Sequence, residues 1–295
     1  MALCAVVHEQ AFANGMGLGV FGHILHRHGI KARIKRLQCG VGFHHFGVVL
    51  GFGRPGFAAG IRTQTGVQKQ IGQAKDDGDD ESEARGPAFE CLDLPDNAYD
   101  DGVSALLAQN QMIQLAKNKK PFFMAVGFRK PHLPFVAPKK YWDLYNRKDL
   151  PLAEFQEHSK NGPEIAYHRS GELRNYTDIP EFATFNEPGN YVRLKKEKQQ
   201  ELIQGYYASV SYTDANVGIL LHTLDSLGTL NNTIIVLWGD HGWHLGDHDL
   251  WEKHTNFEQA TRAPLIIAAP GMKPGKTKSL SEHVDIFPTI CNLAS

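Results

Sequence analysis

The chain has 295 residues, of which 42% are hydrophobic and 21% charged, and its formal net charge is -1. This length can bury a substantial core, and the composition is that of an ordinary globular protein rather than a disordered or fibrous one. The near-zero net charge argues neither for nor against a polyanionic partner. No apolar run reaches the roughly eighteen residues of a membrane span. Four scattered cysteines without a CxxC pair exclude a disulfide framework and a cysteine-based zinc site.

Residues 1–75 differ from the rest of the chain. They hold a single acid, Glu9, against nine Lys and Arg, with dense glycine and clustered histidine, and the acidic run 76–81 follows at once. Three interpretations are open: a basic arm that binds nucleic acid through the run 31–36, a metal site at the histidines, or a stretch translated from the wrong frame or strand. The abrupt change in composition favours the third. We therefore expect residues 1–86 to stand outside the fold, as an atypical segment with an acidic linker.

Helical and strand patterns alternate from residue 87 to residue 295. Apolar periodicity and capping residues define these elements. The predicted helices are 103–118, 196–227 and a last one from 284, and the predicted strands are 121–128, 233–238 and 264–269. The polar, proline-containing stretch 140–195 is interpreted as long surface connections. Strands that alternate with helices predict an α/β fold, with a mostly parallel sheet flanked by helices.

Polar side chains follow two of the predicted strands. Asp240 and His241 stand between glycines after the strand 233–238, and His132 stands between prolines after the strand 121–128. The plain alternatives are a capped turn at Asp240 and a structural role for His132. Because ligands of an open α/β sheet bind at the carboxyl ends of its strands, we expect these side chains to line one crevice.

Lys253 stands twelve residues beyond His241, beside Trp251. A large apolar residue in a polar loop suggests that this loop packs down over the crevice. A carboxylate, imidazoles and an ammonium suit a charged ester, because cations neutralise the charge that builds on the transferring group. The other polar residues nearby lack the spacing of a tight tetrahedral metal site: His244, Asp247, His248 and His254.

Four motifs together resemble the sulfatase family, most closely its iduronate-2-sulfatase branch: KPHLPF at 130–135, GDHGWHLG at 239–246, WEK at 251–253 and RAPLI at 262–266. The similarity covers about residues 90–295, in the expected order and spacing. It implies the alkaline-phosphatase-like α/β fold and hydrolysis of a sulfate ester on a sulfated sugar or glycosaminoglycan. It also implies a bound calcium ion and a formylglycine nucleophile made from a cysteine.

The resemblance also implies roles for individual residues. Asp240 and His241 correspond to metal ligands, although histidine is an unusual ligand for so hard a cation as calcium. His132 and Lys253 correspond to catalytic residues that bind the sulfate, and either could donate a proton to the leaving oxygen. Trp243 corresponds to a residue that lines a sugar subsite.

The chain departs from the family pattern in its N-terminal part. No cysteine is followed by x-Pro-Ser/Ala-Arg, the doublet 76–77 follows no strand, and the small C-terminal subdomain is not visible. We therefore expect a partial catalytic domain with no nucleophile and little turnover by itself. The alternatives are a metal-dependent phosphohydrolase of the same superfamily and a non-catalytic polyanion-binding remnant; nucleic acid is not an expected partner. The relatives are mostly exported, but no signal peptide is visible, so no compartment is assigned.

Overall fold

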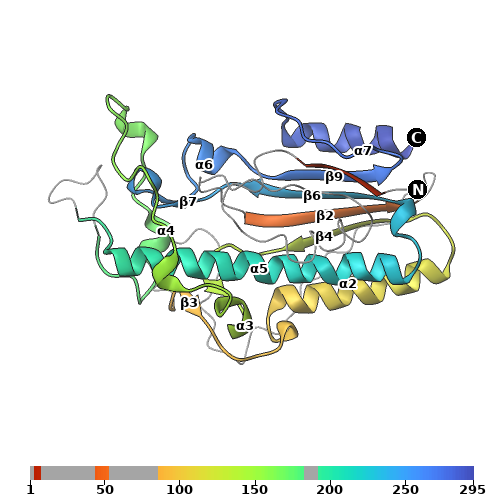
Figure 1. Cartoon of the computed structure of the whole chain (residues 1–295), viewed down its shortest axis with the longest axis horizontal. Coiled ribbons are helices and arrows are strands. Elements are labelled where there is room, and N and C mark those ends of the chain that lie inside the picture. The colour runs from red at the N-terminus through yellow and green to blue at the C-terminus, as the bar shows by residue number, and fades with distance from the viewer. Residues whose placement is uncertain (1–2, 8–43, 53–85, 183–191) are drawn as a thin grey trace.

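The computed structural model describes residues 3–7, 44–52, 86–182 and 192–295. Figure 1 shows a sheet with two long helices, α2 and α5, on one side and the shorter helix α7 on the other. The strands are β1 (Leu3–Val7), β2 (His44–Phe52), β3 (Phe89–Glu90), β4 (Phe123–Phe128), β5 (Phe135–Val136), β6 (Thr233–His241), β7 (His244–Leu245), β8 (Trp251–Glu252) and β9 (Leu265–Pro270). The helices are α2 (Asp100–Lys117), α3 (Lys139–Trp142), α4 (Gly171–Arg174), α5 (Lys196–Ser226), α6 (Glu258–Thr261) and α7 (Ile286–Ala294).

The main sheet has the strand order β1-β9-β6-β2-β4, and each of its four pairings is antiparallel. The prediction of a mostly parallel sheet is therefore wrong for these pairings. Strands β4 and β6 do run in the same direction, joined through α5 as a crossover connection requires. However, β2 lies between them and runs the opposite way, and β9 returns beside β6 after a connection without a long helix.

Two described pieces of residues 1–86 are part of this sheet. Strand β1 pairs with β9, and β2 pairs with both β4 and β6. We expected all of residues 1–86 to stand outside the fold, but these two strands are part of the sheet. The basic run 31–36 and the acidic run 76–81 lie outside the described residues.

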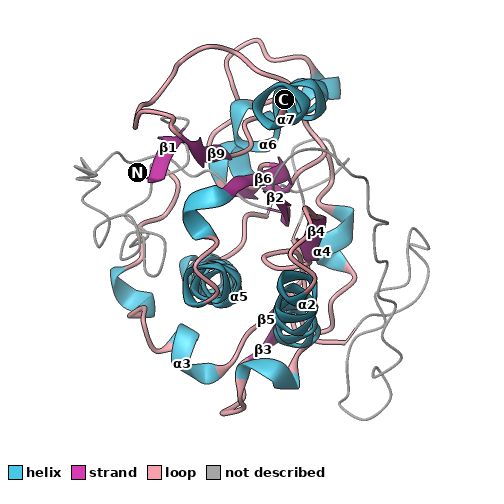
Figure 2. Ribbon diagram, turned by 90° about the vertical axis from the view of Figure 1, so that its right-hand side faces the viewer, coloured by secondary structure: helices cyan, strands magenta, loops and turns pink. Residues whose placement is uncertain are grey.

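Both faces of the sheet are covered, as the end-on view in Figure 2 shows. On one face, Met112 of α2 and Leu220 and Leu224 of α5 pack against Phe128 of β4, all four fully buried. On the other face, Ile286 of α7 packs against β6 and β9. Each such side chain contributes about 1.5–3 kcal/mol of hydrophobic stabilisation. The helices and the α/β class predicted from the periodic pattern are confirmed.

Helix α5 continues past the sheet and there supports a second cluster. Its N-terminal half buries Leu202, Ile203 and Tyr206 against residues from the loops after β4 and β6. Leu173 and Tyr176 join this cluster, so part of the stretch 140–195 is packed structure rather than surface connection. No described helix combines the length and the apolar character that a bilayer crossing needs.

Helix α5 ends where the sequence predicts. Gly228 has φ +68, and its N–H donates to the carbonyl of Asp225 while the N–H of Thr229 donates to the carbonyl of Leu224. This is a Schellman ending, in which glycine takes the left-handed conformation at low cost. It turns the chain directly into β6, whose far end carries the candidate site.

Candidate active site

The loop after β4 is fixed through its backbone before it presents His132. Asp101, buried at the start of α2, accepts from the N–H groups of the first two loop residues at 2.9 and 2.8 Å. The ammonium of Lys130 donates to the carbonyls of His132 and Pro134 at 3.0 and 2.8 Å. The Lys130–Pro131 and Leu133–Pro134 peptide bonds are cis. The loop therefore holds the imidazole in one place.

His132 and Lys253, 121 residues apart in the chain, meet at this point. Lys253 Nζ lies 2.8 Å from His132 Nε2 and donates to Glu172 Oε2 at 2.8 Å. Glu172 Oε1 lies 2.9 Å from the same His132 nitrogen. We call these three residues the ionic trio. Their side chains are only 12–18% exposed, so the loop carrying Lys253 does pack down as the position of Trp251 indicated.

The imidazole of His132 faces two groups of opposite kind. Its Nδ1 lies 2.7 Å from the carbonyl of Leu133, so that nitrogen carries a hydrogen and donates it. Nε2 then either accepts from Lys253 or, when protonated, donates to Glu172. It cannot do both at once, so one close contact of this nitrogen is unfavourable in either protonation state.

The charge state of Glu172 follows from its neighbours. Burial by itself would raise the pKa of this carboxyl, but the hydrogen bonds and positive charges of His132 and Lys253 outweigh burial and hold it well below its usual range. Glu172 is therefore a carboxylate at neutral pH, placed among cations that would otherwise attract an external anion.

Trp243 is a buried neighbour of the ionic trio. It is 1% exposed, with the Lys253 ammonium 5.4 Å from its ring centroid and the His132 ring centroid at 6.0 Å. Tyr206 is stacked nearly parallel to the Trp243 ring, and Phe135 packs against it in a T-shaped contact. The role predicted for Trp243, lining a sugar subsite, stays a prediction, and its ring surface is covered by protein in this structure. Its ring supports the ammonium from below by a cation–π contact.

Asp240 and His241 end strand β6 beside the trio. The His241 N–H donates to Asp240 Oδ1 at 3.0 Å, and Oδ2 lies 3.6 Å from His241 Nε2. Burial lowers the pKa of His241 and outweighs the opposing effects of the hydrogen bond to Gly242 and the charge of Asp240. His241 is thus neutral at pH 7, which a metal ligand must be, and the two side chains offer a carboxylate oxygen and a ring nitrogen from one turn.

The flanking glycines are needed for close approach rather than for turning. Neither Gly239 nor Gly242 has a positive φ. A Cβ on Gly242 would lie 2.0 Å from the backbone oxygen of Gln259, and one on Gly239 would lie 3.0 Å from the ring of Pro264. These glycines therefore let the segment 259–264 lie against the end of β6.

Asp240 and His241 fit one side of a divalent-cation site. Calcium takes six to eight oxygen ligands, and these residues supply two donor atoms. Among the described residues they belong to no group of three His, Cys, Asp or Glu side chains with converging ligand atoms. The donor set is therefore compatible with a divalent cation and does not by itself select calcium.

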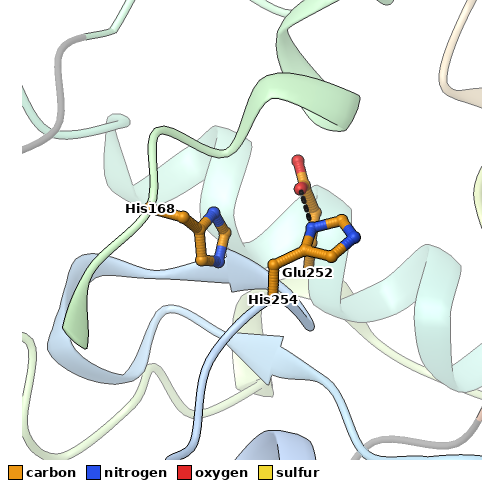
Figure 3. A group of neighbouring side chains, drawn as sticks. All are labelled: His168, Glu252 and His254. Carbon is orange, nitrogen blue, oxygen red and sulfur yellow. Dashed lines mark ion pairs between the residues drawn. The ribbon is translucent and has the colours of Figure 1, made fainter. Parts of the chain in front are cut away.

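A second group of side chains does converge, from the segment before α4 and from the end of β8. His168, Glu252 and His254 place ligand atoms within 4.8 Å of one another (Figure 3). However, Ser170 N–H donates to His168 Nδ1, so the neutral ring carries its hydrogen on Nε2 and offers no lone pair there. Burial lowers the pKa of His168 to about 4 and keeps the ring neutral. As arranged, this group does not suit a metal ion.

Sequence reasoning found His132 and Lys253 but missed Glu172, His168 and Glu252. All three missed residues lie in α4, in the stretch before it, or in β8, where no periodic pattern marks an element. No pattern could have found Glu252 either, because β8 has only two residues and Glu252 itself has φ +78.

Comparisons with known proteins identify the family of the chain. A family model described as Sulfatase matches residues 23–295. Human iduronate 2-sulfatase is 35% identical over 229 residues, which cover 69% of this chain and 41% of the relative. The choline-sulfatase of Rhizobium meliloti is 33% identical over 209 residues, covering 66% of this chain and 36% of the relative. The matched part of this chain thus spans about two fifths of the length of these relatives.

Solved structures share the fold. The phosphonate monoester hydrolase of Agrobacterium radiobacter has a TM-score of 0.51 at 22% identity, over 66% of this chain and 39% of that chain. A protein solved in complex with its substrate, D-glucosamine-2-N,6-O-disulfate, has a TM-score of 0.50 at 22% identity, over 65% of this chain and 48% of that chain. The α/β architecture is therefore that of alkaline-phosphatase-like enzymes.

Proposed function

The chain belongs to the sulfatase family of sulfuric ester hydrolases, and we propose that it supplies the sulfate-binding side of an active site that hydrolyses the sulfate ester of a sugar. The observation that carries this proposal is the meeting of His132 Nε2 and Lys253 Nζ at 2.8 Å beside the end of β6. Two nitrogen donors at this spacing can hold two oxygens of one tetrahedral anion. They are preorganised by the loop after β4 and by Trp243.

Each residue of the pair has a distinct part in the proposed reaction. The Lys253 ammonium has three hydrogens, so it can hold a sulfate oxygen and the bridging oxygen to the sugar. As the bond to the sugar breaks, negative charge builds on that bridging oxygen. Either Lys253 or a protonated His132 can donate a proton there, since both face the same space and are partly shielded from water.

We also propose that Asp240 and His241 hold a divalent cation, with Ca2+ the ion that the family resemblance implies. A cation there would neutralise charge on the sulfate. The support from this chain is the carboxylate oxygen and the neutral imidazole that face each other at 3.6 Å. All further ligands would have to come from outside this pair.

A sulfated sugar is the proposed substrate class, because the relatives at 35% and 34% identity are iduronate 2-sulfatases of human and mouse. None of the four cysteines stands in the Cys-x-Pro-Ser/Ala-Arg pattern of the family nucleophile. We therefore propose that this chain binds sulfate esters but turns them over slowly, because loss of a nucleophile costs several powers of ten in rate.

Binding of p-nitrophenyl sulfate to the full chain tests the proposal by isothermal titration calorimetry. Lys253→Gln keeps the size of the side chain and removes its charge, and we expect it to weaken binding about 10-fold or more. Lys139→Gln is the matched control, because Lys139 is half exposed and pairs only locally with Asp143. Equal affinities of wild type and Lys253→Gln would contradict the proposed site.

A further inference from the structure

A negative side chain stands inside the positive site. Glu172 Oε1 and Oε2 lie 2.9 Å from His132 Nε2 and 2.8 Å from Lys253 Nζ, the two atoms assigned to the sulfate. An incoming ester must therefore meet a carboxylate that already occupies the donors. The sulfate-binding side of the site thus has two basic groups and one built-in anion.

Counting hydrogens decides which contact an ester displaces. His132 Nε2 carries at most one hydrogen and can serve either Glu172 or an ester oxygen, whereas Lys253 has three and can serve both. An ester that takes the His132 hydrogen therefore leaves Glu172 bonded to Lys253. The charge of Glu172 stays within the site when the ester is bound.

The backbone around Glu172 keeps its carboxylate at this position. The Leu173 N–H donates to Glu252, the Arg174 N–H donates to the carbonyl of Ser170, and the Leu173 side chain is 1% exposed. Helix α4 is thus tied down on both sides of Glu172. The side chain of Glu172 can give up the His132 contact by rotation while its backbone stays in place.

The retained charge distinguishes two classes of ester. A sulfate monoester carries one negative charge, whereas a phosphate monoester carries about 1.5 to 2 at neutral pH. Because Glu172 offsets the charge of Lys253 and stays in the site, each negative charge on a bound ester is also repelled by this carboxylate. Resting on the proposed function, we propose that Glu172 is a specificity-determining residue that makes the site favour singly charged sulfate esters over doubly charged phosphate esters.

Calorimetric binding of p-nitrophenyl sulfate and p-nitrophenyl phosphate to the full chain tests this inference, at about pH 8 where the phosphate ester is doubly charged. We expect wild type to bind the sulfate ester more tightly. Glu172→Gln should raise the affinity for the phosphate ester about 10-fold more than that for the sulfate ester, because a second charge doubles the repulsion that is removed. Glu181→Gln, an exposed carboxylate nine residues along the chain, is the control for overall charge.

The outcomes separate this inference from the proposed function. Should Lys253→Gln leave sulfate-ester binding unchanged, or should wild type bind neither ester, the proposed function fails and the inference fails with it. Should Lys253→Gln weaken binding while Glu172→Gln shifts both esters equally or neither, only the inference is overturned. An equal gain in Glu181→Gln would also overturn it, because the effect would then be one of net charge. Far-UV circular dichroism of each variant checks that the fold is kept.

Discussion

Two polar groups share the segments 168–172 and 252–254 and behave differently. The ionic trio and the group of His168, Glu252 and His254 each combine one carboxylate with two basic side chains. In the trio the contacts are 2.8–2.9 Å, whereas Glu252 Oε2 lies 3.8 Å from His254 Nδ1. Nearby cations hold the pKa of Glu172 low, but burial raises that of Glu252, which is fully buried.

This difference separates a partly exposed cluster of paired charges from a buried polar cluster. Glu172 has an ammonium within hydrogen-bonding reach, and the trio keeps 12–18% exposure through which a ligand can enter. Glu252 accepts a backbone N–H from Leu173 and lies behind the trio. In the proposed function the first group exchanges one anion for another, whereas the second holds α4 in place.

The largest expected effect on stability comes from removing the buried Trp243 ring, which contacts the trio. Trp243→Ala deletes a fully buried indole from the cluster around α5, and such truncations cost about 3–5 kcal/mol. We expect the free energy of unfolding, measured by urea denaturation, to fall by that amount. Leu280→Ala is the control, because Leu280 is 100% exposed. A loss below about 1 kcal/mol in Trp243→Ala would contradict the packing described.

Glu172→Gln breaks the charge balance of the trio without changing its size. At pH 7 we expect a loss of about 1–3 kcal/mol in the free energy of unfolding, because hydrogen bonds to charged groups are worth about that much. Urea denaturation of the variant beside Glu181→Gln measures it. A higher free energy of unfolding in Glu172→Gln would contradict this, because burial of the charge would then destabilise the fold more than its hydrogen bonds and ion pairs stabilise it.

The pH dependence of that loss follows from the lowered pKa of Glu172. A carboxyl whose pKa is lower in the folded than in the unfolded state stabilises the fold above its unfolded pKa, about 4.3. This contribution is lost as the pH falls toward the folded pKa. We expect the difference between wild type and Glu172→Gln to be constant above about pH 5 and to shrink below about pH 4. Urea denaturation at several pH values checks this, and a difference that grows on acidification would contradict it.

The smallest effect is expected for the matched change in the second group. Glu252→Gln keeps the oxygen that accepts from the Leu173 N–H and removes a buried charge whose partner His254 lies 3.8 Å away. We expect the free energy of unfolding to change by less than about 1 kcal/mol. A loss greater than that of Glu172→Gln would show that the two groups have been assigned the wrong roles.

The sequence predicts the polar residues that follow the strands better than it predicts how the strands pair. His132, Asp240, His241 and Lys253 could be selected because they follow buried strands or an anchored tryptophan, and the structure brings His132 and Lys253 together. Glu172 could not be selected, because a four-residue helix has no periodic signal and its partners are distant in sequence. The antiparallel pairings of β2 could not be foreseen either, because its short apolar run lies within the glycine-rich residues 1–75, which we expected to stand outside the fold.

A crystal structure of the full chain with p-nitrophenyl sulfate tests the central claim most directly. The account predicts sulfate oxygens within hydrogen-bonding distance of His132 Nε2 and Lys253 Nζ, with Glu172 released from His132 and still bonded to Lys253. An ester bound elsewhere, with the contact between Glu172 and His132 intact, would contradict it.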